Sequence, residues 1–212
     1  MEETIVHGSA KWHEKRAGMI TGSNMEKVLA FSHAYLRRLI GIRNGSIVLP
    51  PPQAPGTVGG ARDWGHANEP RAIAAYELRT GYEIEIAGQW FTHPELDYLG
   101  GTPDGLILSA RGGIEVKCPE NPANFLAAVA TDDFSKHRAQ CATYMAICDL
   151  DWIDVVYYDP RLRHPDDLHV IRCHRDARYE QKMLEACRRF WSAVIAERVP
   201  EVIDTTVIPN LF

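Results

Sequence analysis

The sequence lacks the features that mark membrane proteins, secreted proteins and small metal-stapled scaffolds. Its longest apolar runs are only a few residues, which excludes a transmembrane span. The opening residues Met1–Thr4 have neither the basic nor the apolar region of a secretory signal, so export is not expected. The five cysteines form no C-x-x-C pair, which leaves a zinc ribbon or an iron–sulfur cluster without support. Their odd number, with no export signal, favours reduced thiols in a cytoplasm.

The sequence also lacks an excess of basic residues. Lys and Arg total 23 against 28 Asp and Glu, and the net charge of -5 argues against bulk binding of nucleic acid. A nuclease is not excluded, because a metal site concentrates carboxylates and a local basic stripe can still hold phosphates. The 45% hydrophobic and 24% charged content is ordinary for a globular protein. We therefore expect one domain over residues 1–212, with no membrane partner.

Helix and strand patterns are spread over the whole chain. Helices are expected at about 23–30, where a Ser-Asn-Met-Glu capping box begins, and at 33–43, 61–80, 122–130, 135–148 and 176–198. Strands are expected at 82–87, 89–93, 105–109, 113–117, 152–158 and 168–174. A Pro/Gly-rich run at about 49–60 predicts a mobile loop. This order predicts an α/β sandwich with a mixed sheet.

The segment that indicates a catalytic site contains Pro-Asp-Gly at 103–105 and Glu-Val-Lys at 115–117. Alternate side chains of a strand share a face, so Glu115 and Lys117 point the same way. A hairpin turn between the two motifs would bring Asp104 beside Glu115. The two carboxylates can then share a hard cation such as Mg²⁺, with Lys117 placed to orient or deprotonate a water. Either motif alone is also a common turn or exposed strand edge, so the prediction rests on their combination.

Two helical features add to this pattern. Glu69, in the long helix, could supply a third carboxylate to the metal, although a single helical glutamate is usually solvated. Gln140 and Tyr144 are four residues apart and lie on one helical face. The glutamine can steer a phosphate or an attacking water, and the tyrosine can hydrogen-bond or stack. Read without the rest of the chain, this pair is an ordinary polar patch.

These residues resemble the PD-(D/E)XK nuclease signature, and Gln140-x-x-x-Tyr144 is similar to a further motif in its exonuclease branch. The fuller resemblance is to the family of phage lambda exonuclease and the YqaJ-type viral recombinases, over residues 12 to about 180. Six segments match in family order: 12–23, 64–69, 103–105, 114–119, 139–140 and 158–161. The resemblance implies an α/β restriction-endonuclease-like PD-(D/E)XK core, with a mixed central sheet flanked by helices.

The resemblance also implies a metal site. Its ligands would be Asp104, Glu115, the carbonyl of Val116 and Glu69. Lys117 would position or activate the water, and Gln140 would help to orient it. Mg²⁺ is the expected cofactor; Mn²⁺ is expected to substitute, and Ca²⁺ to bind without turnover.

A pocket for a terminal 5′-phosphate is a further implication of the resemblance. It would be formed by Arg16, Ser23, Thr102, Gln140 and Tyr144. An arginine offers a bidentate fork to a phosphate, and Ser23, at the expected start of a helix, would add the helix amides. Without the family, Arg16 is a surface arginine and Ser23 a plain N-cap.

The activity implied by the family is Mg²⁺-dependent 5′-to-3′ exonuclease digestion of linear double-stranded DNA. It would prefer 5′-phosphorylated ends, release 5′-mononucleotides and leave 3′ tails for recombination by strand annealing. The family also implies a homotrimer ring around DNA, a single-strand annealing protein as partner, and the cytoplasm of a bacterial host as location, with a phage or prophage gene as source. The alternatives are a PD-(D/E)XK endonuclease of restriction or repair type and a non-catalytic DNA-end-binding module.

The chain departs from the family at three places. Arg62 stands where members that split the duplex carry an apolar residue, which leaves the manner of strand separation open. A second phosphate-binding arginine has three candidates, Arg37, Arg38 and Arg43. The Pro-rich run has no evident counterpart.

Overall fold

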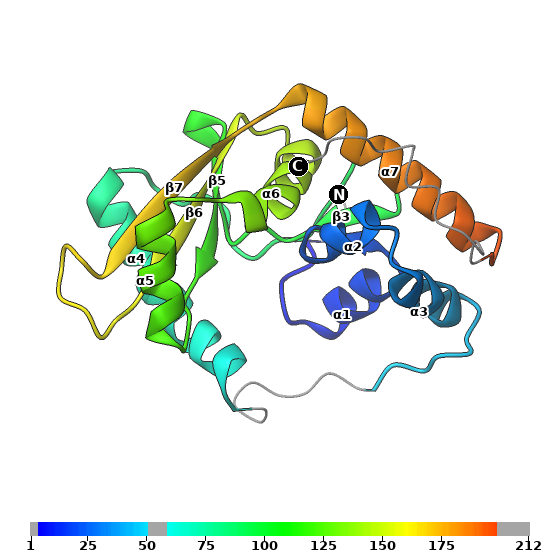
Figure 1. Cartoon of the computed structure of the whole chain (residues 1–212), viewed down its shortest axis with the longest axis horizontal. Helices are drawn as coiled ribbons and strands as arrows, with labels where there is room; N and C mark the ends of the chain where they lie inside the picture. Colours follow the sequence, from blue (N-terminus) through cyan, green and yellow to red (C-terminus); the bar gives the residue numbers. More distant parts are fainter. Residues whose placement is uncertain (1–3, 51–58, 199–212) are drawn as a thin grey trace.

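A four-stranded mixed sheet carries most of the long-range pairing of the chain (Figure 1). Its order is β4-β5-β6-β7, with β4 at Gly105–Ile107, β5 at Gly112–Lys117, β6 at Trp152–Tyr158 and β7 at Leu168–His174. β5 and β6 are parallel, and the two outer pairs are antiparallel. Every residue of β6 is buried, so this strand must be covered on both faces. The computed structural model describes residues 4–50 and 59–198, so most of the loop predicted at 49–60 lies outside the described residues.

Helices supply the cover on both faces of this sheet. On one face, Tyr76 of α4 (Ala61–Thr80) packs with Ile114 and Val156. On the other face, α6 (Arg138–Cys148) packs against Val155 and its neighbours. α5 (Pro122–Thr131) packs near β6, and α7 (Ala177–Ile195) follows β7 and runs across the helices of the N-terminal part (Figure 1). The result is an α/β sandwich with a mixed sheet, as the sequence predicts.

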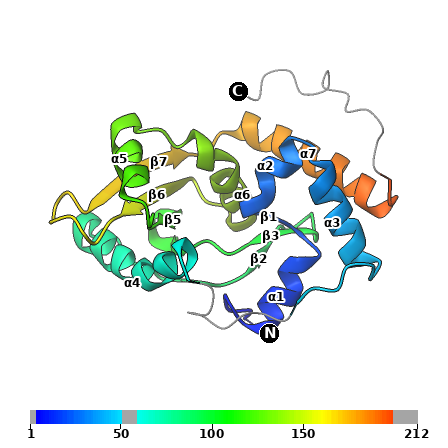
Figure 2. The same ribbon diagram turned by 60° about the horizontal axis from the view of Figure 1, so that its bottom comes forward.

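A second, smaller sheet lies on the far side of α6 (Figure 2). Its order is β1-β3-β2, formed by Ile20–Thr21, Leu99–Gly101 and Phe91–Thr92, with β1 parallel to β3. Helices α1 (Ala10–Ala17), α2 (Met25–Leu29) and α3 (His33–Arg43) surround it, and short 3₁₀ turns occupy 22–24, 108–110 and 135–137. The chain crosses from the small sheet to the large one through residues 102–104, between β3 and β4. The segment that indicates a catalytic site therefore lies where the two sheets meet.

Most predicted elements are present, with the long helix at its predicted bounds. α4 spans Ala61–Thr80, and Gly81 follows it in the left-handed region at φ 73°, where a side chain would be strained. The helices at 33–43, 122–131 and 138–148 and the strands β5, β6 and β7 also agree with the sequence. α1, β1 and β3 were not expected, because none of them is long enough to show a clear period.

The strand predicted at 82–87 is wrong. The segment makes one isolated bridge, between Ile86 and Leu106. The backbone N–H of Ile84 instead donates to the side chain of Glu77 on α4, at 2.8 Å. Gly88, at φ 64°, then turns the chain away. The segment therefore meets β4 only around Leu106, where Glu85 N–H donates to the Leu106 carbonyl and Leu106 N–H to that of Ile86, and forms no continuous strand. The strands predicted at 89–93 and 105–109 are shorter than expected, at Phe91–Thr92 and Gly105–Ile107.

The capping box predicted at Ser23 is wrong as well. Gly22–Asn24 forms a 3₁₀ turn, and the N-cap of α2 is Asn24, which makes no side-chain capping bond. The hydroxyl of Ser23 instead accepts a hydrogen bond from Arg16 at 3.1 Å. A partner seven residues away has replaced the local one, so the side chain of Ser23 does not cap α2. Among the described residues, no helix combines the length and apolar character needed to cross a membrane.

Candidate active site

The site is built on the hairpin formed by β4 and β5. Their antiparallel register pairs Gly105 with Ile114, and this places Asp104, one residue before β4, beside Glu115. Oδ2 of Asp104 accepts a hydrogen bond from the backbone N–H of Val116 at 2.7 Å. The predicted juxtaposition of Asp104 with the strand of Glu115 is therefore present in the structure.

Glu115 is the most enclosed carboxylate of the site, with 4% of its surface exposed. Its Oε1 accepts hydrogen bonds from Lys117 Nζ at 2.5 Å and from Gln140 Nε2 at 2.8 Å. Its Oε2 is buried and has no hydrogen-bond partner. Burying a carboxylate oxygen without a partner costs free energy, and a bound cation would offset this cost.

Three carboxyl groups repel one another here. Burial raises the pKa of Asp104 well above its usual range, and the charges of Glu115 and Glu69 raise it further. Burial also raises the pKa of Glu69, which α4 supplies, and Glu115 adds to this effect. Burial lowers the pKa of Lys117, but the carboxylates of Glu115 and Asp104 outweigh it, and the net shift is upward. Lys117 is therefore an ammonium group that offsets only part of the negative charge.

The donor set fits a hard divalent cation. Among the described residues, no three side chains of His, Cys, Asp or Glu form a closed metal cage. The fit rests instead on the unpartnered Oε2 of Glu115, on Asp104 and on the backbone next to them. Oxygen donors with an open side suit Mg²⁺, which keeps several waters and uses few protein ligands. A cation here would also relieve the carboxylate repulsion that raises the pKa of Asp104.

A cavity of about 160 Å³ opens directly on these carboxylates. Its walls come from both sheets and from helices α1 and α6. Seven of the residues predicted from the sequence line it: Arg16, Ser23, Thr102, Asp104, Glu115, Gln140 and Tyr144. Three other predicted residues, Glu69, Val116 and Lys117, do not line it but act on Asp104 or Glu115 directly. The structure thus brings all ten predicted residues into one neighbourhood.

Hydroxyl groups and one guanidinium face each other across this cavity. Arg16 donates to Ser23, whose hydroxyl also lies 3.3 Å from that of Thr21. Trp12 Nε1 donates to Oγ1 of Thr102 at 2.8 Å, which leaves the O–H of Thr102 free to donate to a ligand. The guanidinium of Arg16 stacks on the Trp12 ring, 4.6 Å from its centroid. These donors, held by side chains of other elements, are suited to binding an anion.

Tyr144 lines this cavity and packs tightly against its wall. It is 5% exposed, and its ring lies so close to Gly22 and Gly101 that a Cβ on either would come within 2.9 and 2.8 Å of it. Its hydroxyl accepts a hydrogen bond from Gln140 at 3.0 Å. Of the two roles expected for Tyr144, the hydrogen bond is present, with Gln140 as its partner, and stacking stays a prediction.

The three candidates for a second phosphate-binding arginine lie outside this cavity. Arg37 and Arg38 are on the exposed side of α3, and Arg43 stacks on Trp191, 4.8 Å from its centroid. Residues that sequence reasoning gave no role also line the cavity, among them His7, Trp12, Thr21 and Trp90. Trp12 and Thr21 lie in a segment that matches the family, and this was an available signal. His7 precedes every matching segment, so no pattern marked it.

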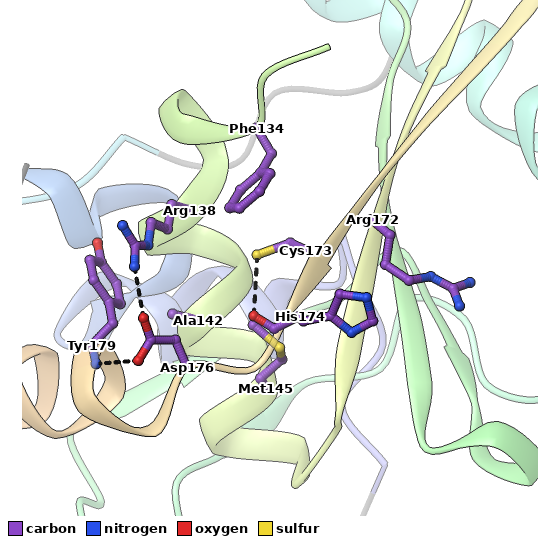
Figure 3. A pocket seen from close by; sticks show the side chains of 9 residues that line it. All are labelled: Phe134, Arg138, Ala142, Met145, Arg172, Cys173, His174, Asp176 and Tyr179. Atoms are coloured by element: carbon purple, nitrogen blue, oxygen red, sulfur yellow. Dashed lines mark hydrogen bonds and ion pairs between the residues drawn. The ribbon is translucent and has the colours of Figure 1, made fainter.

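A second cavity, of about 210 Å³, lies between α6, β7 and α7 (Figure 3). Phe134, Met145 and Cys173 form its apolar side. The charged groups at its edge are already paired, since Arg138 binds Asp176 at 2.9 Å and stacks on Tyr179. It shares no lining residue with the first cavity. The larger cavity is therefore not the one that the predicted residues surround.

The fold and the site together define a protein with a PD-(D/E)XK-like nuclease core. The chain belongs to the YqaJ-like viral recombinase family, whose domain model matches residues 11–151. No individually curated protein sequence matches it.

Solved structures agree with this assignment. An alkaline exonuclease of Laribacter hongkongensis, in a complex with dAMP, is 27% identical over 89% of this chain and 94% of its own, with a TM-score of 0.79. Another structure of the same exonuclease is 26% identical over 89% of this chain and 94% of its own, with a TM-score of 0.78. A phage-related exonuclease of Haemophilus somnus 129PT is 15% identical over 84% of this chain and 96% of its own, with a TM-score of 0.62, and shows the fold alone. The family and the first likeness support a nuclease role for the chain.

Proposed function

We propose that this protein is a Mg²⁺-dependent 5′-to-3′ exonuclease acting on linear double-stranded DNA. One observation carries the proposal: Asp104 and Glu115 line the same cavity as Arg16, Ser23 and Thr102. A terminal phosphate held by the last three residues would place the next phosphodiester beside the carboxylates. Cleavage there releases a 5′-mononucleotide and leaves a 3′ single-stranded tail for recombination by strand annealing.

The preference for a 5′-phosphorylated end follows from the donors of the cavity. Arg16 carries a fixed positive charge and a planar fork, and Ser23 and Thr102 add hydroxyl donors. A 5′-hydroxyl end lacks the charge that Arg16 recognises. Gln140 lines the same cavity, and its amide nitrogen donates to both Glu115 and Tyr144, so it would exchange one of these bonds to donate to a phosphate oxygen.

The metal would be held by Asp104, Glu115, the carbonyl of Val116 and Glu69. When bound, Mg²⁺ lowers the pKa of a coordinated water and takes up charge from the scissile phosphate. Mn²⁺ should substitute, and Ca²⁺ should permit binding without turnover, because its longer and looser coordination does not hold the water correctly.

The remaining catalytic work falls to Lys117 and Gln140. Both donate to Oε1 of Glu115, so their side chains converge on the atom next to the proposed metal oxygen. Lys117 would orient the attacking water, and Gln140 would fix the phosphate or the same water. Lys117 would act through its remaining N–H donors, and Gln140 through its side-chain oxygen or by exchanging one of its bonds to Glu115 and Tyr144.

The family context extends the proposal to the assembly. We propose one nuclease domain over residues 1–212, assembled as a homotrimer ring around the duplex. Enclosure would replace part of the electrostatic grip that a chain of net charge -5 lacks. The partner would be a single-strand annealing protein that loads on the exposed tail. The proposed location is the cytoplasm of a bacterial host, with a phage or prophage gene as source.

The test compares three DNA forms, each with and without Mg²⁺. A linear duplex with 5′-phosphates, a nicked circle and a covalently closed circle are incubated with the protein, and acid-soluble nucleotide is measured. We expect mononucleotides from the linear duplex in Mg²⁺ and an intact closed circle. Cutting of the closed circle would identify an endonuclease instead. Binding of the linear ends with no release under any metal would identify a non-catalytic end-binding module.

A further inference from the structure

Four basic side chains near the mouth of the first cavity have no role in the proposed function. They are His7, His13, Arg62 and His66, which we call the cationic rim. His7 lines the cavity itself, and His7, Arg62 and His66 are exposed. They come from three separate segments: the N-terminal strand-like segment, α1 and α4.

The backbone holds His7 in place at this mouth. Its N–H donates to the carbonyl of Gly88 at 2.7 Å, and Val6 forms a bridge with Gln89. The N–H of Trp90 donates to the carbonyl of Ile5 at 2.9 Å, one step further back. The segment that carries His7 is therefore tied to the chain leading into β2, and the position of His7 follows from main-chain pairing.

Trp12 connects the rim to the cavity. The ring of His7 packs edge-on against Trp12 at 4.3 Å between centroids, and the ring of His13 packs against it at 4.8 Å. His66 lies 6.0 Å from His7 and is one helical turn from Arg62. The same indole donates to Thr102 inside the cavity. The rim and the cavity donors thus share one rigid support.

Nearby positive charge disfavours the protonated forms of His7 and His13. Burial lowers the pKa of His7, and His66, Arg16, His13 and Arg62 lower it further. Burial lowers the pKa of His13 in the same way, with Arg16 and Arg62 adding to the effect.

The acidic residues of α4 stand beside the rim with partners of their own. Glu69 lies near His66 but belongs to the carboxylate group of the site, and Asp63 accepts from the N–H of Gly59. Like charges held together by packing favour an anion from outside the chain.

We propose that the cationic rim is a second phosphate-binding site, which holds an internal phosphodiester of the DNA strand whose 5′-terminal phosphate enters the cavity. This inference rests on the proposed function. The rim is open to solvent, so it suits a chain that continues out of the cavity rather than a small enclosed ligand. It is continuous with the cavity through His7 and Trp12, which matches a backbone leading outward from the first nucleotide.

The proposed contact makes the affinity for DNA depend on pH. A phosphate bound by His7 and His13 stabilises their protonated forms, so binding takes up protons and affinity rises as the pH falls toward about 6. Arg16 on α1 and Arg62 and His66 on α4 face His7 and oppose this uptake in the free protein.

The experiment measures equilibrium binding in Ca²⁺ at about pH 6, with a duplex that carries one neutral methylphosphonate at the first, second or third internal linkage of the 5′ strand. Wild type should lose about 5-fold in affinity at one of these positions, because an exposed ion pair is worth less than a buried one. His7→Ala should weaken binding of the unmodified duplex by a similar factor. A methylphosphonate at the sensitive linkage should cause this variant no further loss of affinity. His7→Arg should restore binding, which a role in packing alone would not do. His174→Ala, in the second cavity, is the matched control and should behave as wild type.

Duplexes with 5′-phosphate and 5′-hydroxyl ends separate this inference from the proposed function. His7→Ala should weaken binding of both ends equally, whereas Arg16→Ala should weaken the phosphorylated end more. The contrary result is that the losses of affinity caused by His7→Ala and by the methylphosphonate are additive at all three linkages. That result would overturn the rim, even if Arg16 still distinguishes 5′-phosphate from 5′-hydroxyl ends. Equal losses by Arg16→Ala on both ends, with the coupling at His7 intact, would overturn the terminal-phosphate pocket and leave the rim standing.

Discussion

The carboxyl group of Asp104 lies close to Glu115 and Glu69, and burial with this repulsion raises its pKa. We expect Asp104→Asn to raise the melting temperature by a few degrees in EDTA, because one repelling charge is lost, and to abolish cleavage. Mg²⁺ should stabilise wild type but not the variant. Thermal unfolding with and without Mg²⁺ tests this, with Asp166→Asn, an exposed acid elsewhere, as control. Near wild-type cleavage by Asp104→Asn would remove Asp104 from the metal site.

Lys117 is held by Glu115 with 28% of its side chain exposed, so it lies at the inner edge of the site. Lys117→Ala should abolish cleavage yet retain binding of duplex DNA in Ca²⁺, since the carboxylates and the phosphate donors remain. Lys117→Arg should not restore cleavage, because a guanidinium group is wider than an ammonium group and is hydrated differently. Single-turnover release of the first nucleotide is the measurement. Substantial turnover by the alanine variant contradicts the catalytic role, and joint loss of binding makes Lys117 a phosphate anchor.

Arg16 is the fixed charge of the proposed phosphate pocket. Arg16→Ala should slow digestion of 5′-phosphorylated ends by about one to two decades, which corresponds to roughly 1.5–3 kcal/mol for a charged hydrogen bond. Digestion of 5′-hydroxyl ends should change far less. Because Arg16 also stacks on Trp12, Arg16→Lys is the companion variant, with the charge kept and the planar stacking lost. Initial rates on the two substrates decide the matter, and equal losses would make Arg16 a general DNA contact.

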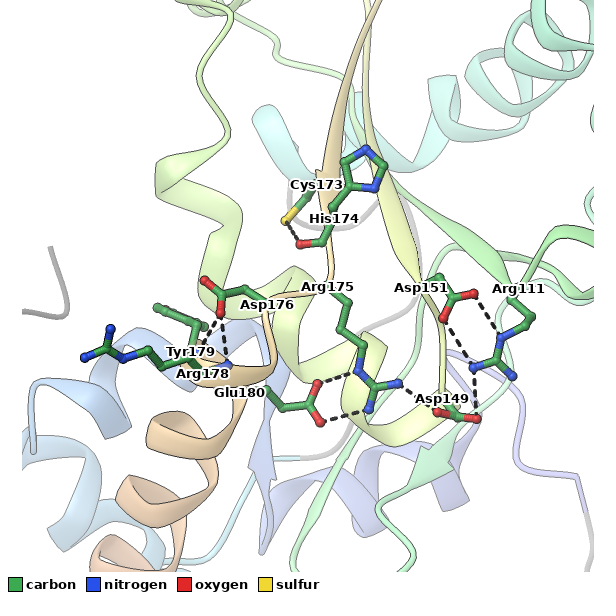
Figure 4. A network of polar contacts seen from close by, with 10 residues as sticks. All are labelled: Arg111, Asp149, Asp151, Cys173, His174, Arg175, Asp176, Arg178, Tyr179 and Glu180. Atoms are coloured by element: carbon green, nitrogen blue, oxygen red, sulfur yellow. Dashed lines mark hydrogen bonds and ion pairs between the residues drawn. The ribbon is translucent and has the colours of Figure 1, made fainter.

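At the scale of elements, a polar network fastens the start of α7 to the large sheet (Figure 4). Arg175 binds Glu180 through two bonds of 2.8 Å and Asp149 at 2.7 Å, and Asp149 also binds Arg111. Asp176 is the N-cap of α7. Its side chain accepts from the backbone N–H groups of residues 178 and 179, both at 3.0 Å.

Replacing the N-cap should weaken α7 in a pH-dependent way. Asp176→Ala should lower the free energy of unfolding by about 1 kcal/mol near neutral pH. The bond from the N–H of Tyr179 lowers the pKa of Asp176, so its contribution is present above the ordinary value of 3.8 and fades as the pH falls further. The difference from wild type should shrink in acid. Asp176→Asn should keep most of the stability without this pH dependence. Urea unfolding at several pH values tests it, and a constant difference down to about pH 2 would contradict it.

At the scale of the whole molecule, the proposed ring predicts a mass in solution. Light scattering on a sizing column should give three times the 23.8 kDa of one chain, with or without DNA. The physical reason for the proposal is that enclosure by three subunits would hold an acidic chain on a duplex. The mass of a single chain at micromolar concentration would contradict the ring. Release of the DNA after each nucleotide would be consistent with such a monomer.

Some of this molecule was determined by the sequence alone. The helix at 61–80 follows from local signals, because Gly81 ends it where only a residue without Cβ is unstrained. The approach of Asp104 to Glu115 also follows from the sequence, since a short hairpin and the two-residue period of a strand leave little freedom. Arg16, Ser23 and Thr102 were found through the resemblance rather than through any local rule.

Other features were decided by tertiary structure. Ser23 carries a capping pattern, yet its hydroxyl binds Arg16, seven residues away, because folding offered a charged partner that the local pattern cannot encode. Residues 82–87 alternate like a strand, but a helix side chain takes the N–H of Ile84 and the ladder does not form. His7 reaches the cavity because its backbone pairs with Gly88, across 81 positions of the chain. Such long-range pairings depend on which segments meet when the core closes, and no local pattern carries that information.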